Sequence, residues 1–268
     1  MSDDETVQAV VLTQQRGHIA IVTINRPDAR NAINLAATEA ISAAIDGYEA
    51  DPDVWVIIIT GSGDKSFCAG QDLKDVASGA GKVTPERFAE LGGWAGISTR
   101  TFRKPVIAAV NGVALGGGTE ICLAADLVVA DEHATFGLPE VKRGLFAAAG
   151  GLERLTRRIP PSIALELVLT GTAIDATRAL QLGLINRVVP KGSCLDASIE
   201  LAGLICENAP LAVQFSKAVV RASFSLGADE LMKDEHLREL RRAAVRSEDF
   251  KEGPRAFAEK RPPNWTGR

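Results

Sequence analysis

Apolar and polar residues along the first part of the chain follow the spacing of short strands and helices. Segments 7–13 and 18–24 alternate as two strands, and the sequence QQRG between them predicts a hairpin turn. Segment 54–60 is a continuous apolar run, which is typical of a buried strand. Segment 35–48 repeats apolar residues at helical spacing, and Asn34 stands where a helix N-cap is expected.

A second unit repeats this order of strand, glycine-containing turn and helix. Segment 105–110 predicts a strand, the sequence NGVALGGG predicts a glycine-rich turn, and segment 119–125 predicts a short apolar helix. Further short apolar segments predict strands at 127–130, 134–136 and 185–189. This repetition is typical of an α/β protein.

The last part of the chain has only helical patterns. They begin at about Ser193 and become increasingly charged toward Arg246. We therefore predict an α/β core over residues 1–192 and a helical segment over residues 193–268. No low-complexity linker separates the two parts, so we expect them to pack together.

Composition excludes several classes of protein. Of the 268 residues, 46% are hydrophobic and 24% are charged, which is enough apolar material for a folded core. A net charge of −4 gives no indication of the positive charge that binding to nucleic acid requires. The first residues are acidic, and no apolar run approaches the ~18–20 residues of a membrane span. We expect a cytoplasmic protein without a membrane or nucleic-acid partner.

Several familiar site motifs are absent from this sequence. The four cysteines and three histidines are scattered, so we expect neither a disulfide framework nor a metal site. The loop GSGDKS has Asp64 where a P-loop needs glycine, and Ser66 where a dinucleotide fingerprint needs its third glycine. No G-x-S-x-G segment is present.

Two glycine-containing turns remain, and each follows a predicted buried strand. SFCAGQDLK follows segment 54–60, and NGVALGGGTE follows segment 105–110. Glycine lets the backbone present bare N–H groups, and the N–H groups at a helix start carry the positive end of the dipole. Two such turns facing each other would hold one developing negative oxygen, such as a thioester carbonyl that becomes an enolate.

Glu120 and Glu140 are the candidates for acid–base chemistry beside these turns. Each also has an ordinary explanation, as an acidic residue in the first turn of a helix. The apolar neighbours of Glu120 favour a buried carboxylate, whereas the ordinary explanation is the stronger one for Glu140 taken alone. Two carboxylates near one oxyanion site would form an acid–base pair.

With these residues, the chain resembles the crotonase superfamily and, within it, the enoyl-CoA hydratases. The resemblance runs from about Val7 to Arg261, and its most specific part is GGG-x-E followed twenty residues later by F-G-x-P-E. The matching segments are NRPDARNAI (25–33), SFCAGQDLKDV (66–76), KPVIAAVNGVALGGGTEICLAADLVVA (104–130), ATFGLPEVKRG (134–144), LTGTAIDATRALQLGLINRVV (169–189) and EGPRAFAEKR (252–261).

The resemblance implies a fold and an activity. The fold is the crotonase/ClpP-like α/β spiral of strand–turn–helix units, with a C-terminal helical oligomerisation segment that forms a trimer or a hexamer. The activity is that of a hydro-lyase that adds water to a trans-2-enoyl-CoA and gives a 3-hydroxyacyl-CoA. CoA is then part of the substrate, and no separate cofactor is implied. Phe257 and Lys260, in the last helix, would reach the CoA of a neighbouring subunit.

The resemblance also implies roles for individual residues. The backbone N–H groups of Gln71 and Gly117 would form an oxyanion hole for the thioester oxygen. Glu120 and Glu140 would hold the water between them, and Glu140 would donate a proton to the α-carbon. The implied substrate and CoA contacts are Ala29, Arg30, Ala69, Asp72, Leu73, Lys74, Gly116, Phe257 and Lys260. Without the resemblance, Asp72 and Lys74 are explained as a solvated helix start.

Three features depart from the family pattern. In the loop GLFAAAGGLE, which borders the acyl pocket, Ala147 stands where many members have proline and Leu152 where they have threonine. Gln71 replaces a smaller residue, and its side chain would narrow the site. The stretch 78–100, which includes Trp94, walls the same pocket and matches no family pattern. The sequence therefore leaves the acyl group undefined.

Other functions stay open on the sequence alone. A Δ3,Δ2-enoyl-CoA isomerase needs only one carboxylate, so the presence of both favours the hydratase over isomerisation or hydrolysis. The C-terminal EGPRAFAEKRPPNWTGR resembles carnitinyl-CoA dehydratases, which act on a bulkier acyl group. A non-catalytic homologue that binds CoA esters or RNA is a different class. The arginines between 238 and 246 are interleaved with acidic residues, which favours a solvated or subunit-facing helix instead.

Overall fold

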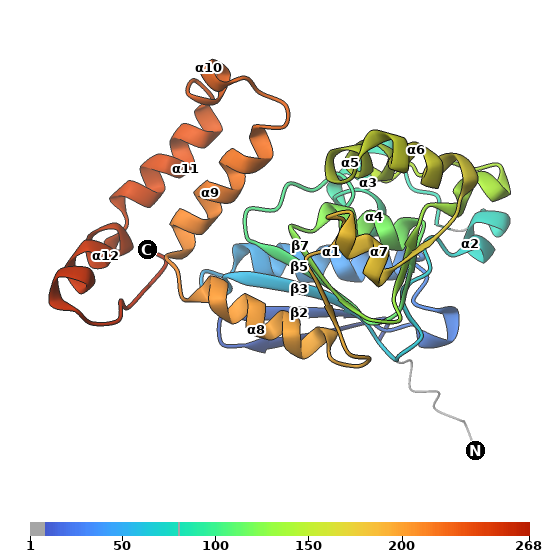
Figure 1. The fold of residues 1–268 in the computed structure, drawn as a ribbon, viewed down its shortest axis with the longest axis horizontal. Helices are drawn as coiled ribbons and strands as arrows, with labels where there is room; N and C mark the ends of the chain where they lie inside the picture. Colours follow the sequence, from blue (N-terminus) through green and yellow to red (C-terminus); the bar gives the residue numbers. More distant parts are fainter. Residues whose placement is uncertain (1–8, 80) are drawn as a thin grey trace.

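The structure, a computed structural model, describes residues 9–79 and 81–268 and contains two β-sheets (Figure 1). The six-stranded sheet has the order β1 (Val11–Arg16), β2 (Ile19–Ile24), β3 (Val56–Gly61), β5 (Val106–Val110), β7 (Leu127–Asp131) and β10 (Arg187–Val189). The four-stranded sheet has the order β4 (Ser66–Cys68), β6 (Val113–Leu115), β8 (Thr135–Gly137) and β9 (Ile174–Asp175). The pairs β1–β2 and β8–β9 are antiparallel, and all other neighbouring strands are parallel.

Helices surround these sheets and then continue into a projecting arm. The helices of the body are α1 (Leu35–Ala50), α2 (Leu73–Ser78), α3 (Pro85–Glu90), α4 (Gly117–Ala124), α5 (Gly151–Arg158), α6 (Pro161–Thr170), α7 (Ala176–Gln181) and α8 (Cys194–Cys206). Short 3-10 helices are η1 (Pro27–Ala29), η2 (Trp94–Gly96) and η3 (Pro139–Arg143). The C-terminal arm, residues 210–268, carries α9 (Pro210–Ala222), α10 (Ala228–Leu231), α11 (Glu235–Arg246) and α12 (Glu248–Glu259).

The six-stranded sheet is buried on both faces, which explains the continuous apolar run of β3. Side chains alternate along a strand, so Ile57 and Ile59 face the larger core and Val56 and Ile58 face the opposite way. α8 packs against the face of Val56 and Ile58, while α1 lies on the other face (Figure 1). The helical region predicted to begin at Ser193 therefore opens with a helix that covers the sheet.

Three successive units of the chain share one path, and this path positions the site. β3 continues into β4, β5 into β6, and β7 into β8, so each unit crosses from the larger sheet to the smaller one. β4, β6 and β8 are parallel neighbours, and their carboxyl ends meet at one edge of the smaller sheet. The segments that follow these strands are therefore brought side by side, although about seventy residues of sequence separate the first from the last.

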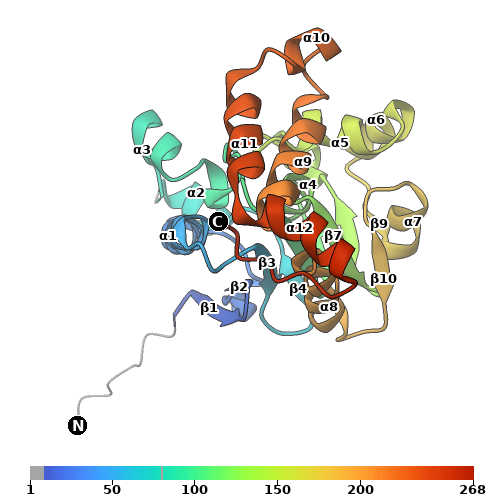
Figure 2. The ribbon, with the colours of Figure 1, turned by 90° about the vertical axis from the view of Figure 1, so that its left-hand side faces the viewer.

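The C-terminal arm projects from the body, and its α9 packs along α11 (Figures 1 and 2). The tail that follows α12 folds back onto the arm and the body. Asp249 in α12 accepts hydrogen bonds from the backbone N–H groups of Thr266 (2.7 Å) and Gly267 (2.9 Å), and the Trp265 indole donates to the Glu207 carbonyl (2.7 Å). Within residues 9–79 and 81–268, every helix falls short of the length and apolarity that crossing a membrane requires.

Two predictions of local structure were wrong. The first strand begins at Val11 and runs through Arg16, so the residues Gln14 and Gln15, expected in a turn, are strand residues; Val7 and Gln8 lie outside the described residues. β1 is an edge strand with exposed side chains, which need not be apolar, and Gly17 with φ of 57° supplies the turn. The predicted turns SFCAGQDLK and NGVALGGG contain the strands β4 and β6, which are short and pair only in the smaller sheet.

Candidate active site

The ends of β4, β6 and β8 each deliver one part of the candidate site. Gln71 follows β4, Gly117 and Glu120 follow β6, and Glu140 follows β8. Gly116 donates from its backbone N–H to the Gly137 carbonyl (2.9 Å), which fixes the second turn against the third. A Cβ placed on Gly70 would lie 3.2 Å from the backbone nitrogen of Gly117, so the first turn also adjoins the second.

Close packing makes glycine necessary in the second turn. Gly116 has φ of 55°, a conformation that L side chains rarely adopt. A Cβ on Gly118 would lie 2.0 Å from the Cys68 carbonyl oxygen, and a Cβ on Gly117 would lie 2.1 Å from the Trp94 ring. The glycines therefore let the start of α4 approach β4 closely enough to bring the two turns together.

The backbone N–H groups of Gln71 and Gly117 are directed away from the protein's own hydrogen-bond ladders. Ile33 pairs with Gln71 in a parallel bridge through the Gly70 carbonyl and the Asp72 N–H, a pattern that turns the N–H of Gln71 to the opposite side. Gly117 is the first residue of α4, where the N–H has no partner inside the helix. Within the described residues neither N–H has a partner, so both can donate to a ligand oxygen.

The Glu120 carboxylate is fixed by the start of α5. One of its oxygens accepts hydrogen bonds from the backbone N–H groups of Ala149 (2.7 Å) and Gly151 (2.8 Å). The side chain is buried, with 5% of the residue exposed, and this burial raises its pKa to about 7 against the lowering effect of the two N–H donors. Glu120 can therefore exist with or without its proton near neutral pH.

Glu140 is half-buried in a different environment. Its Oε2 is buried and has no hydrogen-bond partner among the described residues, and burial raises its pKa. Its other carboxylate oxygen faces the second turn, because a Cβ placed on Gly116 would lie 3.1 Å from Oε1. The nearby negative charge of Glu140 is also one cause of the raised pKa of Glu120. The two carboxyl groups are therefore coupled across one space.

That space is a cavity of about 470 Å³ beside the two turns. It is lined by the proposed catalytic and oxyanion residues and by Ala69, Leu73 and Gly116 from the implied substrate contacts. Most of the remaining lining is apolar. Leu115 comes from β6, and the two stretches expected to wall the cavity contribute Phe88, Trp94, Leu145, Phe146, Ala148 and Ala149. The structure thus brings together residues from four separate segments of the sequence, 69–73, 88–94, 115–120 and 139–149.

Other residues implied to contact CoA lie outside this cavity. The Arg30 carbonyl accepts from the Ala69 N–H (3.1 Å), so the turn of Ala29 and Arg30 adjoins the cavity wall without lining it. Asp72 caps α2 by accepting from the Lys74 N–H and pairs with Arg26 at 2.9 Å, which gives it more than the role of a solvated helix start.

Phe257 and Lys260 belong to the arm, at the end of the molecule opposite α2 and α5 (Figure 1). They do not line the cavity of their own chain, and Phe257 is 87% exposed. Contact with the CoA of a neighbouring subunit stays a prediction for both.

Sequence reasoning missed three features of the site. The Trp94 indole donates to the side-chain oxygen of Gln71 and covers Gly117, so the site is narrowed by the tryptophan and the glutamine together. The N–H donors of Ala149 and Gly151 to Glu120 depend on tertiary packing. Arg143 lines the cavity, and only its spacing of three residues from Glu140 could have indicated this.

The arrangement can stabilise an oxyanion and move protons on either side of it. Two N–H groups directed at one position stabilise negative charge that develops on a carbonyl oxygen. Two carboxyl groups with raised pKa values can act as a general acid and a general base. Among the residues described, no group of three or more His, Cys, Asp or Glu side chains is placed to hold a metal ion.

Comparisons with known proteins agree with this geometry. A family model described as enoyl-CoA hydratase/isomerase matches residues 13–268. The chain is 42% identical to a carnitinyl-CoA dehydratase from Proteus mirabilis, over 94% of this chain and 97% of that one. An enoyl-CoA hydratase structure from Mycobacterium tuberculosis superposes with a TM-score of 0.90 at 46% identity, covering 97% and 100% of the two chains. A carnitinyl-CoA hydratase structure from Mycobacterium avium gives a TM-score of 0.77 at 47% identity, covering 98% and 100%.

Proposed function

We propose that this chain hydrates trans-2-enoyl-CoA thioesters to 3-hydroxyacyl-CoA. The chain belongs to the enoyl-CoA hydratase/isomerase family, which is the crotonase superfamily, and it is a hydratase or dehydratase of the crotonase type. The observation that carries this proposal is the pair of carboxyl groups on one cavity, Glu120 held by two N–H donors and Glu140 with an unpartnered oxygen. An isomerase needs one proton carrier only, whereas the addition of water needs a base for the water and an acid for the α-carbon.

In the proposed reaction the thioester oxygen accepts hydrogen bonds from the N–H groups of Gln71 and Gly117. A water molecule between the carboxyl groups gives a proton to Glu120 while its oxygen bonds to the β-carbon, and the electrons of the double bond move toward the thioester oxygen. Glu140 then delivers its proton to the α-carbon, and a proton returns from Glu120 to Glu140. Both carboxyl groups come from adjacent turns on one side of the cavity, which supports addition to one face of the double bond.

The Arg143 guanidinium supports an acyl group without a positive charge. Glu140 and Arg143 are three residues apart in the 3-10 helix η3, where such residues lie on the same face. Arg143 lines the cavity, and it has no hydrogen bond or ion pair within the described residues. A carnitinyl group carries a quaternary ammonium, which this guanidinium would repel. We therefore propose a neutral enoyl chain as the better substrate.

Dehydration or hydration of a carnitinyl-type thioester is the second candidate. The 42% identity over 94% of the chain to a carnitinyl-CoA dehydratase favours it. The two candidates use the same carboxyl groups and the same oxyanion donors, and they differ in the charge of the acyl group. The acyl end of the cavity therefore decides between them.

The hydratase proposal predicts a specific loss in Glu140→Gln. The glutamine cannot donate a proton as a carboxylic acid does, so we expect the rate of crotonyl-CoA hydration to fall by ~10²–10⁴ while CoA-thioester binding changes little. Loss of the conjugated enoyl-thioester absorbance measures the rate. Glu153→Gln, which changes an exposed carboxyl at the start of α5, is the matched control and should keep the wild-type rate. A wild-type rate in Glu140→Gln would contradict the assignment.

Substrate charge separates the two candidates. We expect wild-type kcat/KM to be several-fold higher for a neutral enoyl-CoA than for the same chain with a trimethylammonium on its γ-carbon, because two like charges a few ångströms apart in water repel by ~1 kcal/mol. Arg143→Met should reduce this preference. Lys142→Met is the control, since the Lys142 side chain lies against Gly171, away from the cavity. A preference for the cationic substrate in the wild type would favour the carnitinyl-type reaction.

A further inference from the structure

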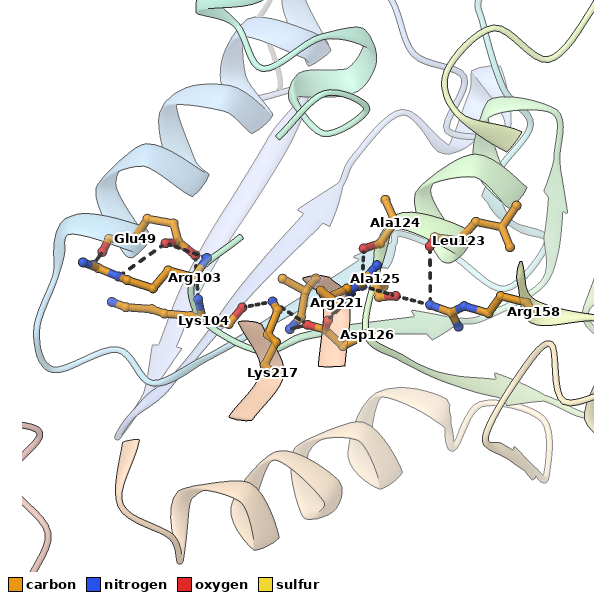
Figure 3. Close-up of polar contacts among 11 residues, drawn as sticks. Glu49, Arg103, Lys104, Leu123, Ala124, Ala125, Asp126, Arg158, Lys217 and Arg221 are labelled. Carbon is orange, nitrogen blue, oxygen red and sulfur yellow. Dashed lines mark hydrogen bonds and ion pairs between the residues drawn. The ribbon is translucent and has the colours of Figure 1, made fainter. Parts of the chain in front are cut away.

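A cluster of charged side chains joins the C-terminal arm to the end of the catalytic helix α4 (Figure 3). Asp126, two residues after α4, accepts hydrogen bonds from the Arg221 guanidinium at 2.8 and 3.1 Å and pairs with the Lys217 ammonium at 2.7 Å. Arg221 and Lys217 lie one helical turn apart on α9 of the arm. The Asp126 carboxylate also accepts a hydrogen bond from the Val106 N–H (2.8 Å), so the residue that binds the arm is itself bonded to β5.

Arg221 extends beyond Asp126 to the last carbonyl groups of α4. It donates to the carbonyl oxygens of Ala124 (3.0 Å) and Ala125 (3.1 Å). Arg158 from α5 reaches the same end of the helix and donates to the Leu123 carbonyl (3.4 Å) and to the Ala125 carbonyl. Carbonyl groups at a helix end lack partners and carry the negative end of the dipole, so two guanidinium groups are well suited to hold them. Figure 3 shows the two side chains approaching these carbonyls from opposite sides.

The other end of α4 carries the proposed chemistry. Gly117 is its first residue, and Glu120 is in its first turn. A helix of eight residues is about 12 Å long and behaves as one rigid piece, so a tilt at its carboxyl end displaces its first turn. Reaction rates are sensitive to such shifts, because a displacement of ~1 Å can cost ~10² in rate.

We propose that Arg221 is a positioning residue that sets the placement of α4, and through it the placement of the Gly117 N–H and the Glu120 carboxylate. The arm then has a role beyond self-association, because its docking on the body holds α4 at the end opposite Gly117 and Glu120. The kinetic part of this inference rests on the proposed hydration reaction. Its structural part, the placement of α4, does not.

Lys217 provides a matched control on the same helix. It pairs with the same Asp126 carboxylate and donates to the Lys104 carbonyl (2.6 Å), so it also docks the arm on the body. Its contacts with the body go to Asp126, Lys104 and the Phe102 ring, and none goes to the carbonyl groups that end α4 (Figure 3). Removing Lys217 therefore weakens the attachment of the arm while the guanidinium contacts to α4 remain.

The test compares Arg221→Met with Lys217→Met in the full chain. We expect Arg221→Met to lower kcat for crotonyl-CoA by about 10- to 100-fold with little change in KM, and Lys217→Met to keep the wild-type kcat although it also loses thermal stability. Arg221→Lys keeps the charge beside Asp126 without the two-pronged hold on the carbonyls, so its kcat should lie between those of the wild type and Arg221→Met. Arg221→Lys also takes the place of Arg221→Met in the comparison if Arg221→Met does not fold.

Equal kcat values in the two methionine variants, whether both are normal or both are lowered, would overturn the proposal. Hydrogen exchange of the segment 113–124 keeps the test independent of the reaction. Faster exchange there in Arg221→Met than in Lys217→Met would support the placement of α4 by Arg221, even if the wild type did not hydrate crotonyl-CoA. Equal exchange in the two variants would contradict it.

Discussion

Glu120 and Glu140 are the same residue type in two different surroundings. Glu120 accepts two backbone N–H donors and is held in one position, whereas the Oε2 of Glu140 is buried without a partner among the described residues. Both have raised pKa values because burial disfavours the charged form. A pair of carboxyl groups with raised pKa values suits a reaction in which one carboxyl accepts a proton and the other donates one.

The raised pKa of Glu120 predicts a dependence of stability on pH. The folded chain releases this proton near pH 7, and the unfolded chain near its ordinary value of 4.5. The contribution of Glu120 to the free energy of unfolding should therefore fall by about 3 kcal/mol as pH rises from 4.5 to 7, a loss that Glu120→Gln lacks. Denaturant unfolding at several pH values measures the difference. Glu166→Gln, at an exposed carboxyl, should follow the wild type, and identical pH curves for Glu120→Gln and wild type would contradict the expectation.

At the scale of elements, the repeated path from the larger sheet to the smaller sheet builds the site. The buried strands and α4 could be predicted because continuous apolar runs and the triple glycine mark them in the sequence. The extent of the edge strand β1 could not, since the residues 14–16 that continue it are polar and exposed. The Trp94 ring over Gly117 and the N–H donors to Glu120 join distant segments, so local patterns contain no signal for them.

The close approach of α4 to its neighbours predicts that two alanine substitutions differ in severity. In Gly117→Ala the obstacle is the Trp94 ring, a side chain that can move, whereas in Gly118→Ala it is the backbone carbonyl of Cys68. We expect overpacking to cost ~1–3 kcal/mol of unfolding free energy in Gly117→Ala and more in Gly118→Ala.

A second substitution distinguishes the two obstacles. Trp94→Leu should restore much of the stability lost in Gly117→Ala and none of that lost in Gly118→Ala. Thermal unfolding of the single and double variants measures this coupling. Equal recovery in both backgrounds would show that the ring is not the obstacle.

At the scale of the whole molecule, the arm is held to the body at both of its ends. Asp126 and the α4 carbonyls bind α9, and the tail after α12 returns to the body, with Gly267 lying beside Trp55. The arm also leaves large apolar side chains exposed, among them Phe224, Phe250 and Phe257. Self-association through this arm, as a trimer or a hexamer, stays a prediction.

The return of the tail depends on one buried carboxylate. Asp249→Ala would leave the N–H groups of Thr266 and Gly267 without their acceptor, so we expect a loss of ~1–3 kcal/mol in the free energy of unfolding. The freed tail should also be removed faster by carboxypeptidase. Glu248→Ala, at the exposed neighbouring residue, is the control. Digestion of Asp249→Ala at the wild-type rate would show that Asp249 does not hold the tail in place.

Addition of water to an enoyl-CoA is tested most directly by the mass of the product. Purified protein would be incubated with crotonyl-CoA in water labelled with oxygen-18, and the thioester products would be analysed by mass spectrometry. We predict a 3-hydroxyacyl-CoA that gains one labelled water, with its formation strongly slowed in Glu120→Gln and Glu140→Gln. A product of unchanged mass, or free CoA with a labelled carboxylic acid, would contradict hydration and indicate isomerisation or hydrolysis instead.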